Sequence, residues 1–322
     1  MKRFLSSIAA AVVLLCMLPL QSQAAELLIP VGRIIGLQLK DDTVTVAAFD
    51  EASDSQARDA GLKIGDELVA INGQAIDCAE DVRAVLKNCS GQVTLSIRRS
   101  GKSHTLKITP QATLDGPRLG VYLRQGIAGI GTVTWYDPDT GKFGTLGHGV
   151  SDAKGDLLKM ASGTAFDAEI VSVKKGRCGE PGQLKGSAEA MTICGTLLRN
   201  TPQGVFGTTK TGWRGEPLPV ASFDEVHTGE ATIRSTVRGD TVQEYSVEIL
   251  KIYPKDRSDN RNFLLKVTDP KLLETTGGIV QGMSGSPILQ DGRIVGAVTH
   301  VLVNDPTTGY GIFIENMLEA AS

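Results

Sequence analysis

Apolar and polar residues alternate in short runs along most of the chain, which is the pattern of half-buried β-strands. Such runs include residues 43–49 and 246–252. Turns separate them, and many of these turns contain one of the 37 glycines. A helical pattern interrupts the runs between Asp77, which can cap a helix, and Lys87. The chain is therefore predicted to be mainly β, with many tight turns.

Residues 1–24 have the pattern of an export signal. Lys2 and Arg3 precede an apolar run over residues 8–20, and small residues follow up to Ala24. We expect cleavage after Ala24. An uncleaved membrane anchor is the alternative, although the run is shorter than the roughly 20 apolar residues that a spanning helix needs. The rest of the chain is expected beyond the cytoplasmic membrane.

Charge and cysteine content narrow the range of partners. The net charge of -3 provides no broad basic field for nucleic acid or an anionic membrane. Cys78 and Cys89 flank the expected helix, so they would lie roughly 16 Å apart, too far to bridge. Cys178 and Cys194 could pair in an oxidising compartment, or all four could be free thiols. No spacing of cysteine and histidine indicates a metal, and no cofactor is expected.

The segment AGLKIGDELVAINGQAI, residues 60–76, resembles the PDZ domain, and the resemblance extends over residues 25–112. In that family a loop of backbone N–H groups binds the carboxylate of a peptide, which adds as a strand to the edge of the sheet. The resemblance places this loop at Ile35, Gly36 and Leu37. It implies partners that are protein substrates, recognised through their C-termini or internal peptides.

The segment GIVQGMSGSP, residues 278–287, carries the candidate nucleophile, Ser284. A serine hydroxyl needs a base to take its proton and N–H donors to stabilise the oxyanion. Glycines on both sides allow a tight turn in which the N–H groups of Gly282 and Ser284 can point into one small cavity. A Gly/Ser surface turn is the alternative.

The residues that follow Ser284 strengthen its assignment. A short strand, a turn and the run 293–298 resemble the order in trypsin-like and HtrA-like proteases. By that resemblance, Thr299, His300 and Val301 would line the substrate cleft.

His148 is the best candidate for the base among four histidines. It has a glycine on each side and follows a predicted strand, so it is sterically free to reach across a cleft. His104 falls on an expected exposed strand of the PDZ-like part. His227 has no comparable setting, and His300 lies on a strand that we expect to run away from the nucleophile.

Three segments together resemble the SpoIVB peptidase family of spore-forming bacteria. They are GIGTVTWYDP at residues 129–138, LGH at 146–148 and TGGIVQGMSGSP at 276–287. That family combines a membrane-targeting segment, a PDZ domain and a trypsin-like peptidase domain, in this order. The resemblance implies a double β-barrel over residues 113–322.

The same resemblance implies the catalytic residues Ser284, His148 and Asp269. Asp269 is the weakest of the three, because a turn aspartate before proline is common in structural roles. Asp240 and Asp224 are the fallback candidates. The implied activity is that of an exported serine endopeptidase that cleaves itself and a membrane-associated regulator.

The family's setting is the space between forespore and mother-cell membranes, in a pathway that activates a late sigma factor. Two alternatives stay open: a catalytically inactive PDZ adaptor, and a general quality-control protease of the HtrA type, in which the PDZ domain follows the protease domain.

Overall fold

The structure is a computed structural model, and it describes residues 26–51, 54–152, 155–187 and 192–322. The predicted export signal, residues 1–24, therefore lies outside the described part of the chain. Within that part, no helix combines the length and the apolar character that crossing a membrane requires.

Six strands close into a first β-barrel, because β11 pairs with β12 as well as with β2. In order around the ring they are β2 (Ile34–Asp41), β11 (Ile127–Tyr136), β12 (Lys142–Thr145), β17 (Gly204–Thr208), β16 (Ile193–Thr201) and β13 (Met160–Asp167). Two short strands, β1 (Leu27–Pro30) and β18 (Leu218–Pro219), extend the sheet beside β11. Leu37, Val133 and Phe143 are buried in its interior.

Six further strands form a second closed barrel. In order around the ring they are β19 (Gly229–Arg238), β20 (Thr241–Ile252), β21 (Phe263–Val267), β24 (Asp305–Phe313), β23 (Arg293–Leu302) and β22 (Pro287–Gln290). Phe263 and Phe313 pack edge to face in its core with their ring centroids 4.6 Å apart. A hairpin of β14 (Glu169–Lys174) and β15 (Gln183–Ser187) and helix α4 (Pro270–Thr276) lie at its side.

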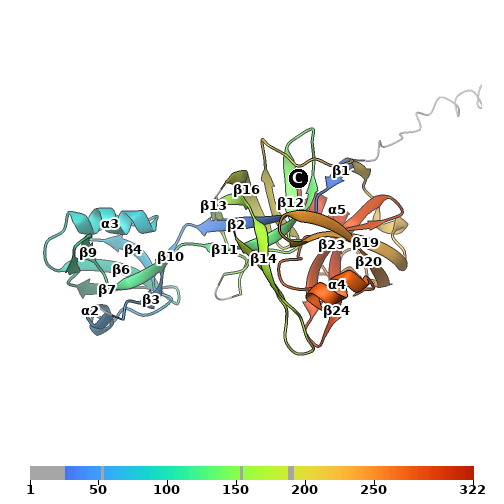
Figure 1. The fold of residues 1–322 in the computed structure, drawn as a ribbon. Coiled ribbons are helices and arrows are strands. Elements are labelled where there is room, and N and C mark those ends of the chain that lie inside the picture. The colour runs from blue at the N-terminus through green and yellow to red at the C-terminus, as the bar shows by residue number, and fades with distance from the viewer. Residues whose placement is uncertain (1–25, 52–53, 153–154, 188–191) are drawn as a thin grey trace, which may run out of the picture.

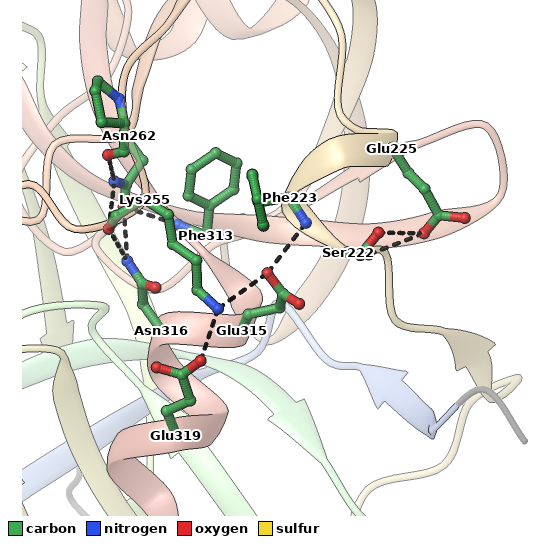
Figure 2. Close-up of polar contacts among 10 residues, drawn as sticks. Ser222, Phe223, Glu225, Lys255, Asn262, Phe313, Glu315, Asn316 and Glu319 are labelled. Carbon is green, nitrogen blue, oxygen red and sulfur yellow. Dashed lines mark hydrogen bonds and ion pairs between the residues drawn. The ribbon is translucent and has the colours of Figure 1, made fainter. Parts of the chain in front are cut away.

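A polar cluster holds the C-terminal helix α5 (Ile314–Ala321) against the second barrel (Figure 2). The Lys255 ammonium lies 2.6 Å from a carboxylate oxygen of Glu319 and 3.3 Å from one of Glu315. The buried Asn262 amide donates to the Lys255 carbonyl, which also accepts from Asn316. These bonds fix the segment between β20 and β21 to α5.

The third unit has the topology of a PDZ domain. Its sheet has the order β10-β3-β4-β6-β7, formed by β10 (Val121–Arg124), β3 (Val44–Phe49), β4 (Glu67–Ile71), β6 (Val93–Arg99) and β7 (Lys102–Ile108). The short strands β5 (Gln74–Ala75), β8 (Gln111–Thr113) and β9 (Gly116–Arg118) and helix α2 (Asp54–Asp59) complete it. Helix α3 (Ala79–Lys87), which the sequence pattern predicts, buries Val82, Val85 and Leu86 against this sheet.

The PDZ domain is inserted into the first barrel. The sequence had instead predicted that it precedes the whole peptidase domain. β2 and β11 are antiparallel neighbours, with Leu39 opposite Ile127. Everything between them, residues 42–126, projects from the tip of this barrel hairpin (Figure 1). The predicted boundaries, 25–112 and 113–322, thus differ from the structure, because β1 and β2 belong to the first barrel.

The four cysteines in the described part, Cys78, Cys89, Cys178 and Cys194, are free thiols. Cys178 is exposed, whereas Cys194 is buried in the first barrel, so the two do not form the bridge that the sequence left open. Burial raises the pKa of Cys194 to about 12, which keeps this thiol protonated and unreactive.

Candidate active site

Ser284 lies at the seam between the two barrels, in the loop that joins α4 to β22. On one side the Thr132 N–H donates to the Ser284 carbonyl at 3.0 Å, and the Thr132 hydroxyl donates to the Gly282 carbonyl at 2.9 Å. On the other side the Gly285 N–H donates to the Val298 carbonyl at 2.8 Å. The loop is therefore held by β11 of the first barrel and by β23 of the second.

Gly285 permits this close approach. Its φ is +94°, a conformation that side chains disfavour, and a Cβ there would lie 2.0 Å from the Thr132 carbonyl oxygen. The seam can close around Ser284 only if this position carries no side chain. The sequence predicts a tight turn here, and the contact with Thr132 gives the reason for one of its glycines.

The candidate oxyanion hole consists of the N–H groups of Gly282 and Ser284. Within the described residues, neither group donates to a protein acceptor, whereas the N–H groups of Met283, Gly285 and Ser286 all do. Two neighbouring donors without protein partners are what an oxyanion hole requires. The assignment of this pair remains a prediction.

The Ser284 hydroxyl donates to the Thr299 carbonyl at 2.8 Å. The pairing of β23 with β24 shifts register between Val298 and His300, and such bulges are frequent beside active sites. The hydroxyl is thus engaged with backbone in this conformation. This hydrogen bond must break before a base can take the hydroxyl proton.

His148 follows β12 in a turn that packs against the same part of β23. Leu146 and Gly147 both have positive φ, +70° and +68°. Positive φ is strained for leucine, and such strain concentrates at functional sites. A Cβ at Gly147 would lie 2.9 Å from Cγ2 of Thr299, so the turn directly contacts the residue that holds Ser284.

Among the described residues, the His148 ring has one hydrogen bond, 2.9 Å long, between Nδ1 and the Gly149 carbonyl. A carbonyl only accepts, so Nδ1 carries the hydrogen and Nε2 keeps a free lone pair in the neutral ring. Burial lowers the pKa of His148, and the bond to Gly149 opposes this shift. His148 is therefore neutral near pH 7, the form that a general base requires.

His300 lies beside His148, with the ring centroids 5.3 Å apart and the planes at 40°. The expectation that its strand leads away from the nucleophile is wrong. β22 and β23 form an antiparallel hairpin in which Pro287 pairs with Ala297, so the chain returns past the Ser284 loop. The short Gln290–Asp291–Gly292 turn in the sequence was the signal for this return.

Asp269 caps helix α4: its carboxylate accepts from the Leu272 N–H at 2.9 Å. Within the described residues, the His148 ring has a hydrogen bond to the Gly149 carbonyl and a ring contact with His300, and no hydrogen bond or ion pair joins it to Asp269. The catalytic role of Asp269 therefore stays a prediction. The fallback candidates lie on the surface: Asp240 is 3.6 Å from Arg33, and Asp224 lies in a short 3-10 helix.

The predicted peptide-binding loop at Ile35, Gly36 and Leu37 needs correction. These residues lie in the middle of β2, which is hydrogen-bonded to β11 on one side and β13 on the other. No edge is left for a peptide. An apolar strand punctuated by glycine has the same pattern in a PDZ sheet and in a barrel, and the sequence alone did not separate them.

Strand β10 is an edge strand of the PDZ sheet. It ends the strand order and pairs with β3 alone. Gly120, with φ +72°, precedes it, as a tight loop before a peptide-binding strand would require. The signal in the sequence was the pattern Arg118–Leu119–Gly120–Val121, which repeats the glycine-containing pattern found at β2.

The predicted cleft residues Thr299, His300 and Val301 lie on β23 beyond its last pairing with β22 at Ala297. Over this stretch β24 is the strand partner of β23. Such a segment next to Ser284 can pair with an extended substrate.

Two closed six-stranded barrels with a serine and a histidine at their seam are the architecture of trypsin-like serine peptidases. The chain belongs to the SpoIVB peptidase S55 family, which matches residues 115–318. Residues 51–99 match the PDZ domain family.

Several curated relatives match part of the chain. A do/HhoA-like periplasmic serine protease of Haemophilus influenzae is 35% identical over 91 residues, 24% of this chain and 20% of that protein. Zinc metalloprotease RasP of Geobacillus kaustophilus is 34% identical over 67 residues, 20% of this chain and 16% of that protein. The chain thus spans about a fifth of the length of these relatives.

The solved structures that match the chain have low sequence identity to it. The active form of the Rv3671c protease of M. tuberculosis is 15% identical and has a TM-score of 0.36, covering 62% of this chain and 73% of that one. The PDZ domain of the SdrC-like protein of Listeria monocytogenes is 19% identical with a TM-score of 0.23, covering 27% of this chain and 92% of that one.

Proposed function

We propose that the chain is an exported serine endopeptidase of the SpoIVB type. It cleaves itself and a membrane-associated regulatory protein, in signalling between two compartments that activates a late sigma factor during spore formation. The observation that carries the peptidase chemistry is that Ser284 and His148 both contact one bulge of β23 at the barrel seam. Family membership supports the sporulation setting.

The proposed location rests on the sequence of residues 1–24. The export signal there would deliver the peptidase across the cytoplasmic membrane, into the space between forespore and mother cell. If the signal is retained, it anchors the enzyme at the membrane, near its substrate.

The proposed mechanism is acyl transfer through Ser284. The hydroxyl leaves the Thr299 carbonyl, gives its proton to Nε2 of His148 and attacks the peptide carbonyl. The N–H groups of Gly282 and Ser284 stabilise the oxyanion. His148 then protonates the leaving amine, and water repeats the sequence to release the acyl group.

The PDZ domain would recruit the peptide to be cut, or a segment of the enzyme's own chain. Its open edge at β10 can accept an extended peptide through main-chain hydrogen bonds. Only two residues, Gln125 and Gly126, separate β10 from β11, so the docking edge lies on the same chain segment that reaches the seam.

Fluorophosphonate labelling together with N-terminal sequencing of self-cleavage fragments tests this proposal. Wild-type protein should be labelled at Ser284 and should release defined fragments, and Ser284→Ala should do neither. Ser286→Ala is the matched control: it removes a hydroxyl of the same loop that is bonded to Ser235 in the interior. Equal cleavage by wild type and Ser284→Ala would contradict the proposal.

One observation favours a second candidate, a PDZ adaptor with a silent peptidase fold. The Ser284 hydroxyl is bonded to a backbone carbonyl in place of His148. An adaptor would bind peptides but leave Ser284 unlabelled at every pH. A quality-control protease of the HtrA type would instead digest unfolded proteins broadly, which a casein digest distinguishes from cleavage at few sites.

A further inference from the structure

We propose that Arg261 is a specificity-determining residue that binds an acidic side chain of the substrate, a few residues from the bond that is cut. The inference deepens the proposed peptidase function of Ser284 and rests on it. A guanidinium without a carboxylate partner among the described residues carries it, because this group lies on the ring of Tyr310, a strand partner of the cleft residue His300.

A row of side chains connects Arg261 to the base. The His300 ring lies against the His148 ring with the centroids 5.3 Å apart, and His300 pairs with Tyr310 between β23 and β24. Cζ of Arg261 lies 5.0 Å from the Tyr310 ring centroid. Directly paired residues project from the same face of a sheet about 5 Å apart, so the row measures roughly 15 Å, which an extended peptide of about five residues spans.

Arg261 belongs to the segment between β20 and β21, and this segment reaches the first barrel. Nδ2 of Asn260 donates to the Pro202 carbonyl, in the turn between β16 and β17, at 3.3 Å. The same turn lies against the loop of the base, because a Cβ at Gly149 would be 2.7 Å from the Thr201 carbonyl oxygen. The segment that carries Arg261 therefore lies at the seam where the reacting groups meet.

The charge of Arg261 has no bound carboxylate, unlike the charges of two other basic residues of its segment. The Lys255 ammonium is bound by two carboxylates of α5 (Figure 2), and Arg257 donates to both carboxylate oxygens of Asp259, at 2.5 and 2.9 Å. Arg261 contacts Asp259 only through its backbone N–H, at 3.2 Å. Within the described residues its guanidinium has no hydrogen bond, and its Nε atom is buried without an acceptor.

A carboxylate is the ligand that fits this group. A half-buried guanidinium has lost part of its hydration, and a buried donor without a partner is unfavourable. A carboxylate supplies both the opposite charge and the paired acceptors that match the planar fork of N–H donors. The Tyr310 ring attracts the cation to its face, so the guanidinium is held in place before a substrate arrives.

The neighbouring histidine adds no competing charge. Burial is the main cause that lowers the pKa of His300 to about 4, and the charges of His148 and Arg261 lower it further. His300 is therefore neutral near pH 7, and the uncompensated charge at this end of the row is that of Arg261.

A positional peptide library tests the subsite. Each acetylated octapeptide amide carries Asp, Asn or Lys at one fixed position, and the amide removes the C-terminal carboxylate that a PDZ domain can bind. For the wild-type enzyme, Asp should raise kcat/KM about tenfold or more over Asn at one position within about five residues of the cut bond. A charge-assisted hydrogen bond contributes about that much.

Charge reversal separates binding of substrate from a structural role. Arg261→Gln should lose the preference for Asp, and Arg261→Glu should prefer Lys at the same position, a gain that requires a folded enzyme. Arg261→Lys keeps the charge without the planar fork and should retain only part of the preference. The matched control, Arg257→Gln with Asp259→Asn, removes an adjacent ion pair at constant net charge and should keep the full preference.

Binding of the same peptides to the Ser284→Ala protein, measured by fluorescence anisotropy, tests the subsite without the chemistry. The Asp peptide should bind about tenfold more tightly than its Asn counterpart, and adding Arg261→Gln should abolish the difference. If an active enzyme cuts and binds the two peptides equally at every position, or if Arg261→Glu still prefers Asp, the subsite is overturned and the peptidase function stands. If the binding difference is present but wild-type Ser284 is never labelled by a fluorophosphonate, the subsite stands and the proposed peptidase function fails.

Discussion

The two barrels and the PDZ sheet use their backbone hydrogen bonds in opposite ways. Every strand of the two barrel rings has a strand neighbour on both sides, so unpaired backbone is left at strand ends such as residues 299–301 of β23. The PDZ sheet ends at β10 and β7, and a strand with an unpaired edge can accept another chain. The comparison shows how one kind of secondary structure provides a rigid catalytic seam in one region and a docking edge in the other.

The two regions are nevertheless parts of one continuous hairpin. β10 leads into β11 through Gln125 and Gly126, and β11 carries Thr132, which holds the Ser284 loop. If the regions are functionally separate, a change in one should spare the other. The following predictions test that separation, beginning with the largest effect.

Replacing the nucleophile should abolish the activity of the seam and leave the PDZ edge intact. Ser284→Ala should lower kcat/KM by on the order of 10⁴-fold or more, because no other group can form the acyl-enzyme. Peptide affinity of the PDZ domain, measured by fluorescence anisotropy, should stay within about twofold. A parallel loss of peptide binding would show that the two regions are not separate.

Filling the space at Gly285 should destabilise the barrels. Gly285→Ala combines positive φ with a clash against Thr132, and we expect a cost of about 3 kcal/mol. Trp135 and Trp213, the two tryptophans of the chain, both lie in the peptidase part, so their fluorescence during urea unfolding reports on that part alone.

Gly292→Ala is the matched control for this clash. Its φ is also positive, at +73°, but a Cβ there meets nothing within 4 Å. It should cost only about 1 kcal/mol. Equal unfolding midpoints for the two variants would mean that the seam tolerates a side chain beside Thr132.

Much of the site was predictable because its motifs are local. The glycines around Ser284 and those around His148 predict open, tightly bent turns at strand ends, and the structure has such turns there. The mainly β fold and the helix over residues 79–87 followed from periodicity in the same way. Each of these features depends on neighbours within about ten residues in sequence.

The parts that the sequence missed depend on partners far along the chain. β2 has the pattern of a PDZ strand, and only its pairing with β11, about 90 residues later, assigns it to the barrel. His300 meets His148 across 152 positions, because the β22–β23 hairpin reverses direction. The sequence around Asp269 fits a helix cap and a triad member equally well. Its hydrogen bond with the Leu272 N–H is seen only in the structure.

The peptidase should lose activity at a lower pH than it would if its base were an exposed histidine. Burial lowers the pKa of His148 below its ordinary value of 6.5. The neutral base form therefore persists below pH 6.5, and kcat/KM should fall about tenfold per pH unit only below that lowered pKa. Rates on a short peptide across pH 4 to 9 measure this limb. If kcat/KM instead begins to fall at or above pH 6.5, His148 is exposed to solvent or is not the base.

The smallest effect should come from Gln125, which joins the two regions. Its amide donates to the Asp41 carbonyl at 3.2 Å and to the Asp77 carbonyl at 2.7 Å, so it ties the end of β2 to the start of the PDZ helix region. Gln125→Ala removes both bonds at a local cost of about 1 kcal/mol. Amide exchange near Asp41 should become faster, with Arg124→Ala as the control because it changes an exposed neighbour.

Hydrolysis of a short peptide by Gln125→Ala should stay within about twofold of wild type, because the loop bonds of Thr132 are untouched. Cleavage of a substrate that also carries a PDZ ligand is the sharper measurement. If only that substrate is cut more slowly, Gln125 sets the orientation in which β10 presents a peptide to Ser284. If the short peptide is affected equally, the hairpin transmits strain to the seam, and the separation of docking edge from catalytic seam does not hold.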